Sequence, residues 1–200
     1  MNENTNAVQK KDTKITTPIF RVSFPSVFQA KAGMDGGPGK FGITMLFDTK
    51  DPATAKGLEV MKNAVRAAVA EKWGADKTKW PKGLRLPFRD GTEKDYDGYG
   101  PGIVFCSATS KMKPGLVDGA LQPIIEPSEF YAGCYARATI NAYAYDRNGN
   151  RGVAFGLRNI QKVKDGESFS GASKPENDFD TIETPADGGS KAEESDPLGL

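Results

Sequence analysis

The chain has 200 residues, with 27 Lys and Arg against 26 Asp and Glu, and it contains no histidine. This length accommodates one domain with tails, and the missing histidine excludes His-based catalytic triads, acid–base pairs and metal sites. The sequence has no apolar run near the ~20 residues of a membrane span, and its polar start has no signal-peptide core. We therefore expect a soluble, cytoplasmic protein.

The charge is divided unevenly along the chain. Residues 1–164 hold 25 Lys and Arg against 16 Asp and Glu, a net charge of +9, whereas residues 165–200 hold 2 against 10, a net charge of −8. A basic body favours a polyanionic partner, and an acidic tail can compete with that partner. Cys106 and Cys134 lie in apolar strand patterns, so we expect buried, reduced thiols and no disulfide.

The first part of the chain predicts two strands after a flexible N-terminus over residues 1–14. The first strand is expected over 16–31, where Pro25 marks an edge or a bulge, and the second over 41–47. Alternation places Phe20, Val22 and Phe24 on one face of the first strand. It places four side chains on one face of the second, namely Phe41, Ile43, Met45 and Phe47. We expect Phe20, Phe41, Phe47 and, further on, Phe105 in the core.

A helix is predicted to begin at Asp51 and Pro52, an N-cap carboxylate followed by proline at the first helical position. Gly74 is a natural C-cap. Helical spacing gives the segment an apolar stripe, made of Leu58, Met61, Val65, Ala68 and Val69. A lone amphipathic helix usually packs on the core, so we expect a lid on the fold rather than a partner-binding helix, with Trp73 continuing the stripe.

A long irregular segment over 75–102 combines basic and aromatic side chains, chiefly Lys79, Trp80, Arg85, Phe88 and Arg89. The segment is too long for a passive connection, so we expect a functional loop. A third strand over 103–109 then leads into a basic turn that carries Lys111 and Lys113.

The clearest pattern is the unbroken alternation over residues 134–145, which predicts a strand. One face is small and apolar, with Cys134, Ala136, Ala138, Ile140, Ala142 and Ala144. The other carries Tyr135, Arg137, Thr139, Asn141, Tyr143 and Tyr145. Rings beside Arg suit the stacking of nucleobases and the pairing of phosphates. The alternative is that these tyrosines pack beneath the long loop or the helix.

An Asn-Gly turn within residues 146–150 predicts a hairpin into a fifth strand over 151–164, which carries Arg158. Five short strands and one helix favour a mostly β protein, with an OB-fold-like barrel over residues 15–165. The helix falls between the second and third strands, whereas the usual OB position lies between the third and fourth. Residues 166–200 are rich in Ser, Gly and acids, so a disordered acidic tail is expected, ending in Leu198 and Leu200.

Two further motifs bear on nucleotide binding and on metal-dependent cleavage. The Gly-rich stretch over 36–41 fails as a P-loop, because Met34 stands where the first glycine should be and Phe41 stands where a Ser or Thr should bind magnesium. Lys40 remains a candidate phosphate contact there. The acidic cluster of Asp90, Glu93, Asp95 and Asp97 could serve a metal-dependent nuclease, but it lacks EF-hand spacing, and a solvated acidic loop is favoured.

Several short motifs resemble a family of bacteriophage single-stranded DNA-binding proteins, long catalogued as a domain of unknown function. They are Phe47-Asp-Thr-Lys-Asp-Pro52, Pro87-Phe-Arg-Asp-Gly91, Tyr99-Gly-Pro-Gly102, Gly133-Cys-Tyr-Ala-Arg137 and Gly156-Leu-Arg-Asn159. The resemblance covers roughly residues 15–165. It implies an OB-fold that binds single strands without sequence preference during phage replication or recombination, in the host cytoplasm. It also implies that the acidic tail contacts replication proteins.

The sequence therefore predicts a non-enzymatic single-stranded DNA-binding protein with no cofactor and no membrane partner. A stacking platform accepts any base, so RNA is a second candidate ligand. The predicted binding residues are Tyr135, Arg137, Tyr143, Tyr145, Lys79, Trp80, Arg85, Phe88, Arg89, Lys111, Lys113 and Arg158. The alternatives are the nuclease and an adaptor whose aromatic face binds another protein.

Overall fold

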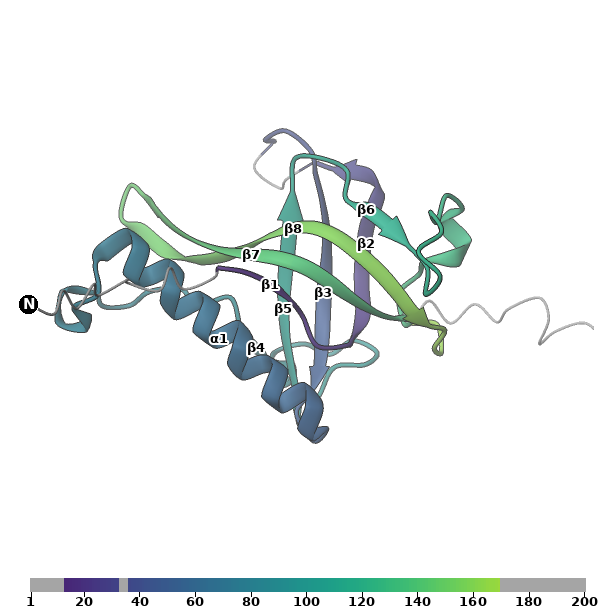
Figure 1. Cartoon of the computed structure of the whole chain (residues 1–200), viewed down its shortest axis with the longest axis horizontal. Helices are drawn as coiled ribbons and strands as arrows, with labels where there is room; N and C mark the ends of the chain where they lie inside the picture. Colours follow the sequence, from purple (N-terminus) through teal and green to yellow (C-terminus); the bar gives the residue numbers. More distant parts are fainter. Residues whose placement is uncertain (1–12, 33–35, 170–200) are drawn as a thin grey trace, which may run out of the picture.

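The computed structural model describes residues 13–32 and 36–169, which form a closed barrel with one helix against it (Figure 1). The five barrel strands are β2 (Phe20–Lys31), β3 (Lys40–Asp48), β5 (Ile103–Ser110), β7 (Tyr135–Arg147) and β8 (Asn150–Lys164). Strand β2 pairs with β3, β3 with β5, β5 in parallel with β8, β8 with β7, and β7 with β2. The prediction of a mostly β, five-stranded OB-fold-like barrel is confirmed, including the unusual position of the helix.

Short elements extend this barrel at its margins. Strand β1 (Lys14–Thr16) pairs with β7, β4 (Arg89–Asp90) with β5, and β6 (Gly115–Val117) with β8. Three 3-10 helices, Lys77–Lys79, Gly91–Glu93 and Pro127–Glu129, lie in the connections. Strands of two or three residues are too short to show a periodicity, which is why the sequence did not reveal them.

The alternation of β7 is confirmed in the core. Five small side chains of its apolar face are buried, namely Cys134, Ala136, Ala138, Ile140 and Ala142. They join a single cluster with larger side chains, including Phe20 and Phe47, whose rings meet edge to face at 5.8 Å. Both cysteines are buried and unpaired, as predicted, and burial raises the pKa of each thiol.

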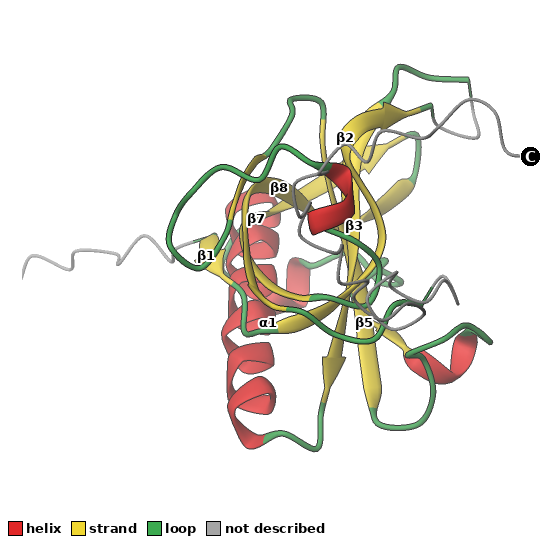
Figure 2. Cartoon of the chain, turned by 90° about the vertical axis from the view of Figure 1, so that its right-hand side faces the viewer, coloured by secondary structure: helices red, strands yellow, loops and turns green. Residues whose placement is uncertain are grey.

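Helix α1 (Pro52–Trp73) lies along one side of the barrel (Figure 2). Its N-cap is Asp51, whose carboxylate accepts from the Thr54 backbone N–H at 2.8 Å and from the Thr54 hydroxyl at 2.6 Å. These two hydrogen bonds, the hydroxyl first, lower the pKa of Asp51. Gly74 ends the helix with φ of 90°. The whole predicted apolar stripe is buried in the core cluster, so this face is used for packing.

Three phenylalanines depart from the predicted pattern. Phe24 does not share a face with Phe20, because the register shifts beyond Ser23 and the bulge expected near Pro25 turns its ring outward, 53% exposed. Phe41 is only half-buried. Phe105 is buried, but on the outer side of β5 beneath Tyr99, whose ring centroid lies 5.2 Å away. Among the described residues, no helix is long and apolar enough to cross a membrane.

Candidate nucleic-acid interface

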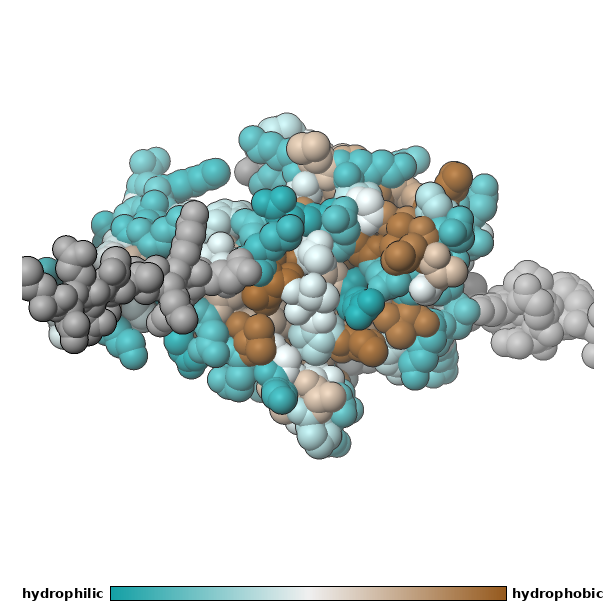
Figure 3. Space-filling model, viewed as in Figure 1, coloured by the Kyte–Doolittle hydropathy of each residue, from teal (hydrophilic) through white to brown (hydrophobic). Residues whose placement is uncertain are grey.

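The outer side of β7 and its two neighbours forms a continuous polar surface. Strand β1 lies on one side of β7 and β8 on the other, so that Lys14 pairs with Asn141, and Arg137 with Gln161, in the strand register. We call this the β7 surface, defined by Lys14, Arg137, Thr139, Asn141, Tyr143, Arg158, Asn159 and Gln161. Figure 3 shows the side on which β7 and β8 cross the barrel, with neutral and apolar side chains among hydrophilic ones.

One hollow of the β7 surface is lined in part by Tyr143, which is 43% exposed. It runs from β1 across β7 and β8 to the β5–β6 connection, and is lined by Lys14, Asn141, Tyr143, Arg158, Asn159, Thr109, Ser110, Met112 and Lys113 among others. A Cβ at Gly156 would lie 2.7 Å from Asn141 Oδ1, and one at Gly115 would lie 2.7 Å from Asn159 Oδ1. The two glycines therefore let these amides lie close against the sheet, where hydrogen-bonding groups form the floor.

A second hollow adjoins the first at Asn159 and contains Arg137. Arg137 Nε donates to Gln161 Oε1 at 2.8 Å, and Gln161 Nε2 donates to the Asp118 carbonyl at 3.0 Å. This chain of hydrogen bonds orients the guanidinium without neutralising it. The apolar side chains Val117 and Leu121 line the same hollow.

Some cations elsewhere in the described residues are held in ion pairs. Arg89 is paired with Glu93, Arg151 with Asp146, and Lys62 with Glu59. In contrast, neither Arg137 nor Arg158 forms a salt bridge within the part of the chain that the structure describes. Both side chains are exposed, so each can pair with a phosphate without first breaking an ion pair.

The basic turn lies at the rim of the first hollow. Lys111 and Lys113 are both exposed in the β5–β6 connection, and Lys113 lines the hollow itself, with its Nζ 6.0 Å from the centroid of the Phe28 ring. The structure therefore brings three of the predicted residues, Tyr143, Arg158 and Lys113, to one hollow, and Lys111 lies in the same turn as Lys113.

The long loop contributes less to this surface than the sequence suggested. Trp80 is half-buried and donates from Nε1 to the Gly74 carbonyl at 2.8 Å, next to the end of α1. Phe88 is half-buried with its ring 5.7 Å from that of core residue Phe155. Both rings pack on the core, and no periodicity in the loop could have distinguished this role from base stacking. Lys79 is exposed and lies 3.9 Å from Asp76.

The two arginines of the loop lie in different places. Arg85 exchanges backbone hydrogen bonds with β8 at Arg151 and Val153, and its chain passes close to Gly152, as does the Tyr145 hydroxyl. Arg85 and Tyr145 therefore extend the β7 surface toward the β7–β8 turn. Arg89 lies elsewhere, over the Phe105 ring at 5.2 Å.

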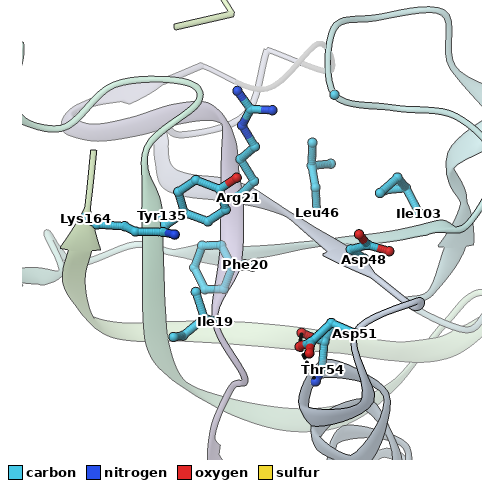
Figure 4. A pocket seen from close by; sticks show the side chains of 11 residues that line it. Ile19, Phe20, Arg21, Leu46, Asp48, Asp51, Thr54, Ile103, Tyr135 and Lys164 are labelled. Atoms are coloured by element: carbon cyan, nitrogen blue, oxygen red, sulfur yellow. Dashed lines mark hydrogen bonds between the residues drawn. The ribbon is translucent and has the colours of Figure 1, made fainter. Parts of the chain in front are cut away.

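Tyr135 also lies away from the β7 surface, although it belongs to the same strand face. Lys164 Nζ is 4.6 Å from its ring and the Arg21 guanidinium 5.8 Å. These three side chains stand at one end of a pocket, and Asp48 and Asp51 stand at the other (Figure 4).

This neighbourhood is a second basic-aromatic surface, of which the sequence analysis predicted only Tyr135 as a binding residue. We call it the β2 surface, defined by Arg21, Phe24, Tyr96, Tyr99, Phe105, Tyr135 and Lys164. Ring centroids link Phe24 to Tyr96 at 5.4 Å, Tyr96 to Tyr99 at 5.8 Å, and Tyr99 to Phe105 at 5.2 Å. Burial raises the pKa of Tyr99, whose hydroxyl donates to Ser23 Oγ at 3.2 Å. Besides Tyr135, the sequence signal for this surface was the pair Tyr96 and Tyr99 in the 75–102 segment.

Two carboxylates of the acidic cluster, Asp90 and Glu93, are engaged in hydrogen bonds within their own loop. Asp90 caps the 3-10 helix by accepting from the Thr92 N–H at 2.8 Å and the Thr92 hydroxyl at 2.6 Å, which lowers the pKa of Asp90. The hydrogen bond from Arg89 lowers the pKa of Glu93, which also accepts from the Asp90 N–H in a capping box. Within residues 13–32 and 36–169, no three His, Cys, Asp or Glu side chains are arranged to hold a metal ion.

A small OB-type barrel that carries an exposed tyrosine, asparagine side chains and arginines without an acidic partner among the described residues is typical of one class, the single-strand nucleic-acid-binding modules. Within that class the chain belongs to the family described as Enterobacter phage Enc34, ssDNA-binding protein, whose family model matches residues 13–189. The resemblance inferred from the short motifs is thereby confirmed.

Individual relatives agree with this assignment. The chain is 33% identical over 166 residues to protein p50 of Acyrthosiphon pisum secondary endosymbiont phage 1, covering 79% of this chain and 87% of that protein. The single-stranded DNA-binding protein of bacteriophage Enc34, solved in complex with ssDNA, superposes with a TM-score of 0.65 at 22% identity, covering 78% of this chain and 89% of its own. The gp2.5 single-stranded DNA-binding protein of bacteriophage T7 gives 0.52 at 14% identity, over 80% and 97%. The two structures share the fold.

Proposed function

We propose that this protein binds single-stranded DNA without sequence preference, in phage DNA replication or recombination. The observation that carries the proposal is the β7 surface, where the exposed Tyr143 shares a hollow with Arg158, and Arg137 lies in the adjoining hollow; neither arginine has an acidic partner among the described residues. The family and the fold support the same ligand.

The proposed mode of binding follows from the chemistry of these side chains. Bases stack on Tyr143 and Tyr145, because every base presents a π-face and the stacking tolerates any sequence. Phosphates pair with Arg137 and Arg158, and with the lysines of the rim, releasing counterions. The Asn floor offers both donors and acceptors, so it supports any base edge without selecting one.

This mode favours single strands over duplex. The rings need unstacked bases, which a duplex does not offer. Because the platform does not read the sugar, single-stranded RNA is a second expected ligand.

The proposal also assigns a role to the acidic tail. Residues 166–200 are proposed as an acidic tail that competes with DNA for the basic barrel over residues 15–165 and contacts replication proteins in the host cytoplasm. All of this tail beyond residue 169 lies outside the described residues, as do residues 1–12 of the proposed flexible N-terminus.

The protein is proposed to hold DNA and not to cleave it. Asp90 and Glu93, the centre of the nuclease alternative, are engaged in a helix cap and an ion pair. Incubation of labelled single-stranded DNA with the protein and Mg²⁺ or Mn²⁺ should leave its length unchanged. Metal-dependent shortening that is lost in Asp90→Asn would establish the nuclease instead.

A tryptophan placed on the β7 surface tests the proposal directly. The native indoles of Trp73 and Trp80 are half-buried beside the core, so they report poorly on this surface. In Tyr143→Trp, titration with oligo-dT should quench the added fluorescence in a saturable manner, because a stacked base quenches an indole. Binding that leaves this emission unchanged would place the DNA elsewhere.

A further inference from the structure

The chain beyond β8 turns back and lies on the β2 surface. Arg21 Nη2 donates to the Glu167 carbonyl at 2.8 Å. The Tyr131 hydroxyl donates to Asp165 Oδ1 at 2.7 Å. Residues 165–169 are thus held by specific hydrogen bonds to two elements that are distant in the sequence.

Close backbone approach shows how tightly this segment is packed. A Cβ at Gly133 would clash with the Glu167 carbonyl oxygen, and one at Gly98 would clash with the Phe169 ring. Both glycines have positive φ, 110° and 82°. The Phe169 backbone N–H donates to the Ala132 carbonyl at 3.0 Å. The barrel is therefore shaped to accept a backbone at Gly133 and a flat ring at Gly98.

The Phe169 ring separates two hollows of the β2 surface. Its centroid lies 4.3 Å from the Arg21 guanidinium. Gly98, against which the ring packs, lines the first hollow together with Arg21, Tyr135 and Lys164 (Figure 4). Phe169 itself lines the second hollow, together with Ser23, Phe24, Pro25, Lys31, Tyr96, Asp97 and Ala132. We call the two hollows, together with the Phe169 ring beside them, the groove of the β2 surface.

Phe24, on the wall of the second hollow, is held in a strained conformation that core packing does not explain. Its φ is 45°, in the left-handed region that aromatic residues rarely adopt. The ring is nevertheless 53% exposed and meets the 55% exposed ring of Tyr96 edge to face at 5.4 Å. A conformation that displays an aromatic ring instead of burying it is typical of a binding site.

The geometry points to a nucleobase-binding site on the β2 surface, between Phe24, Tyr96 and Arg21, which Phe169 of the same chain occupies until a single strand displaces it. This inference rests on the proposed function. The Phe169 ring on the Arg21 guanidinium shows that the site takes a flat ring, and a base carries the same flat π-system.

The charged side chains around the groove favour a phosphate backbone at its Lys164 end and along its middle, but not at its other end. Lys164 and Arg21 flank the first hollow and Lys31 the second, whereas Asp97 lies beside Tyr96 and Asp48 and Asp51 close the far end near α1. The expected path of the strand therefore runs from Lys164 past Arg21 to Lys31, away from the helix.

Photo-crosslinking of the full-length protein tests the site by position. Oligo-dT carrying 5-iododeoxyuridine crosslinks to aromatic side chains on which the base stacks, and mass spectrometry identifies the modified residue. Adducts on Phe24 or Tyr96 are expected, in addition to adducts on Tyr143. A protein that binds the oligonucleotide but carries no adduct on the β2 surface would overturn this inference and leave the proposed function intact, whereas absence of any binding would refute the proposed function.

A substitution pair tests the same site by affinity. Phe24→Asn removes the ring but tolerates positive φ, so the fold should be retained. It should weaken oligo-dT binding by about tenfold, the effect of losing one stacked base. The matched control is Val60→Asn, which replaces an equally exposed apolar side chain on the outer face of α1, 48% exposed, and should change affinity by less than about twofold. Equal affinities of the two variants would overturn the inference.

The variant Phe169→Ala tests whether the Phe169 ring blocks the proposed base-binding site. Removing the competing ring should raise oligo-dT affinity by about threefold or more, because the apparent affinity of a site falls with the fraction of molecules in which it is open. The gain should persist at high salt, since the variant changes no charge. A gain that vanishes as salt rises, or no gain at all, would show that Phe169 does not block the site.

Discussion

The β7 and β2 surfaces are built from the same kinds of side chain, but they differ in what already satisfies those side chains. On the β7 surface, Tyr143 is exposed, and Arg137 contacts a neutral amide. On the β2 surface, the rings pack edge to face on one another, and Arg21 is covered by Glu167 and Phe169 of the same chain. A basic-aromatic composition therefore does not locate an open binding site, because the partners of each cation and ring decide whether a ligand has access.

Salt should have the largest effect if phosphates bind at the β7 surface and its rim. Four cations, Lys111, Lys113, Arg137 and Arg158, imply a slope of about −2.8 for the logarithm of affinity against the logarithm of salt concentration, at about −0.7 per phosphate. Affinity for oligo-dT should thus fall about 50-fold between about 50 and 200 mM salt. Anisotropy titrations measure the slope, and a slope near zero would exclude phosphate pairing as the main source of affinity.

Loss of the exposed ring should have the next largest effect. Tyr143→Ala should weaken oligo-dT binding by about tenfold, since stacking contributes about 1–3 kcal/mol per base. Tyr143→Phe keeps the ring and should bind within about twofold of the unmodified protein. Competition assays at fixed salt compare the two, and equal losses in both would mean that the hydroxyl, not stacking, makes the contact.

Removal of a single unpaired cation should have a smaller effect with a distinct signature. Arg137→Gln should reduce the magnitude of the salt slope by about 0.7, the share of one phosphate on a single strand. Lys62→Gln, which removes a cation paired with Glu59 on α1, is the charge-matched control and should leave the slope unchanged. An equal change of slope in both variants would indicate a general charge effect and no phosphate site at Arg137.

Deletion of residues 166–200 should have the smallest effect, in the opposite direction. Binding of oligo-dT should tighten by about three- to fivefold at low salt, because the Phe169 ring and the competing acids are both removed and screening is weak there. A shorter deletion of residues 170–200 retains Phe169 and separates the loss of charge from the loss of the ring. Unchanged affinity in the longer deletion would argue against competition by the tail on either surface.

The sequence predicted those parts of the fold that depend on local pattern. The Asp51 cap, the Gly74 end and the buried face of β7 follow from residue type and spacing, and the structure confirms all three. The chain order of five strands and one helix also sufficed for the barrel. The short strands β1, β4 and β6 depend on pairing with distant partners, so no local signal identified them.

The candidate site was less predictable, because long-range packing decides which side chains remain exposed. Trp80 and Phe88 are residue types that often stack on bases. In the structure, however, Trp80 donates a hydrogen bond at the end of α1, and Phe88 packs against the core ring Phe155. The return of Phe169 onto Arg21 joins segments more than 140 residues apart in the chain, and the bulge that turns Phe24 outward depends on the pairing of β2 with β3. Alternation on β7 correctly identified the side chains of its outer face. It could not show that Tyr143 belongs to the β7 surface and Tyr135 to the β2 surface.

The most direct test of the account compares one labelled oligo-dT with a duplex of the same length, by anisotropy at a single low salt concentration. Stacking on the exposed Tyr143 ring requires unstacked bases, so we expect at least about tenfold tighter binding of the single strand. We further expect that Tyr143→Ala narrows this preference, because the lost contact is one that only a single strand makes. Equal affinities for the two ligands, or a preference that Tyr143→Ala leaves unchanged, would contradict the assignment of single-strand binding to the β7 surface.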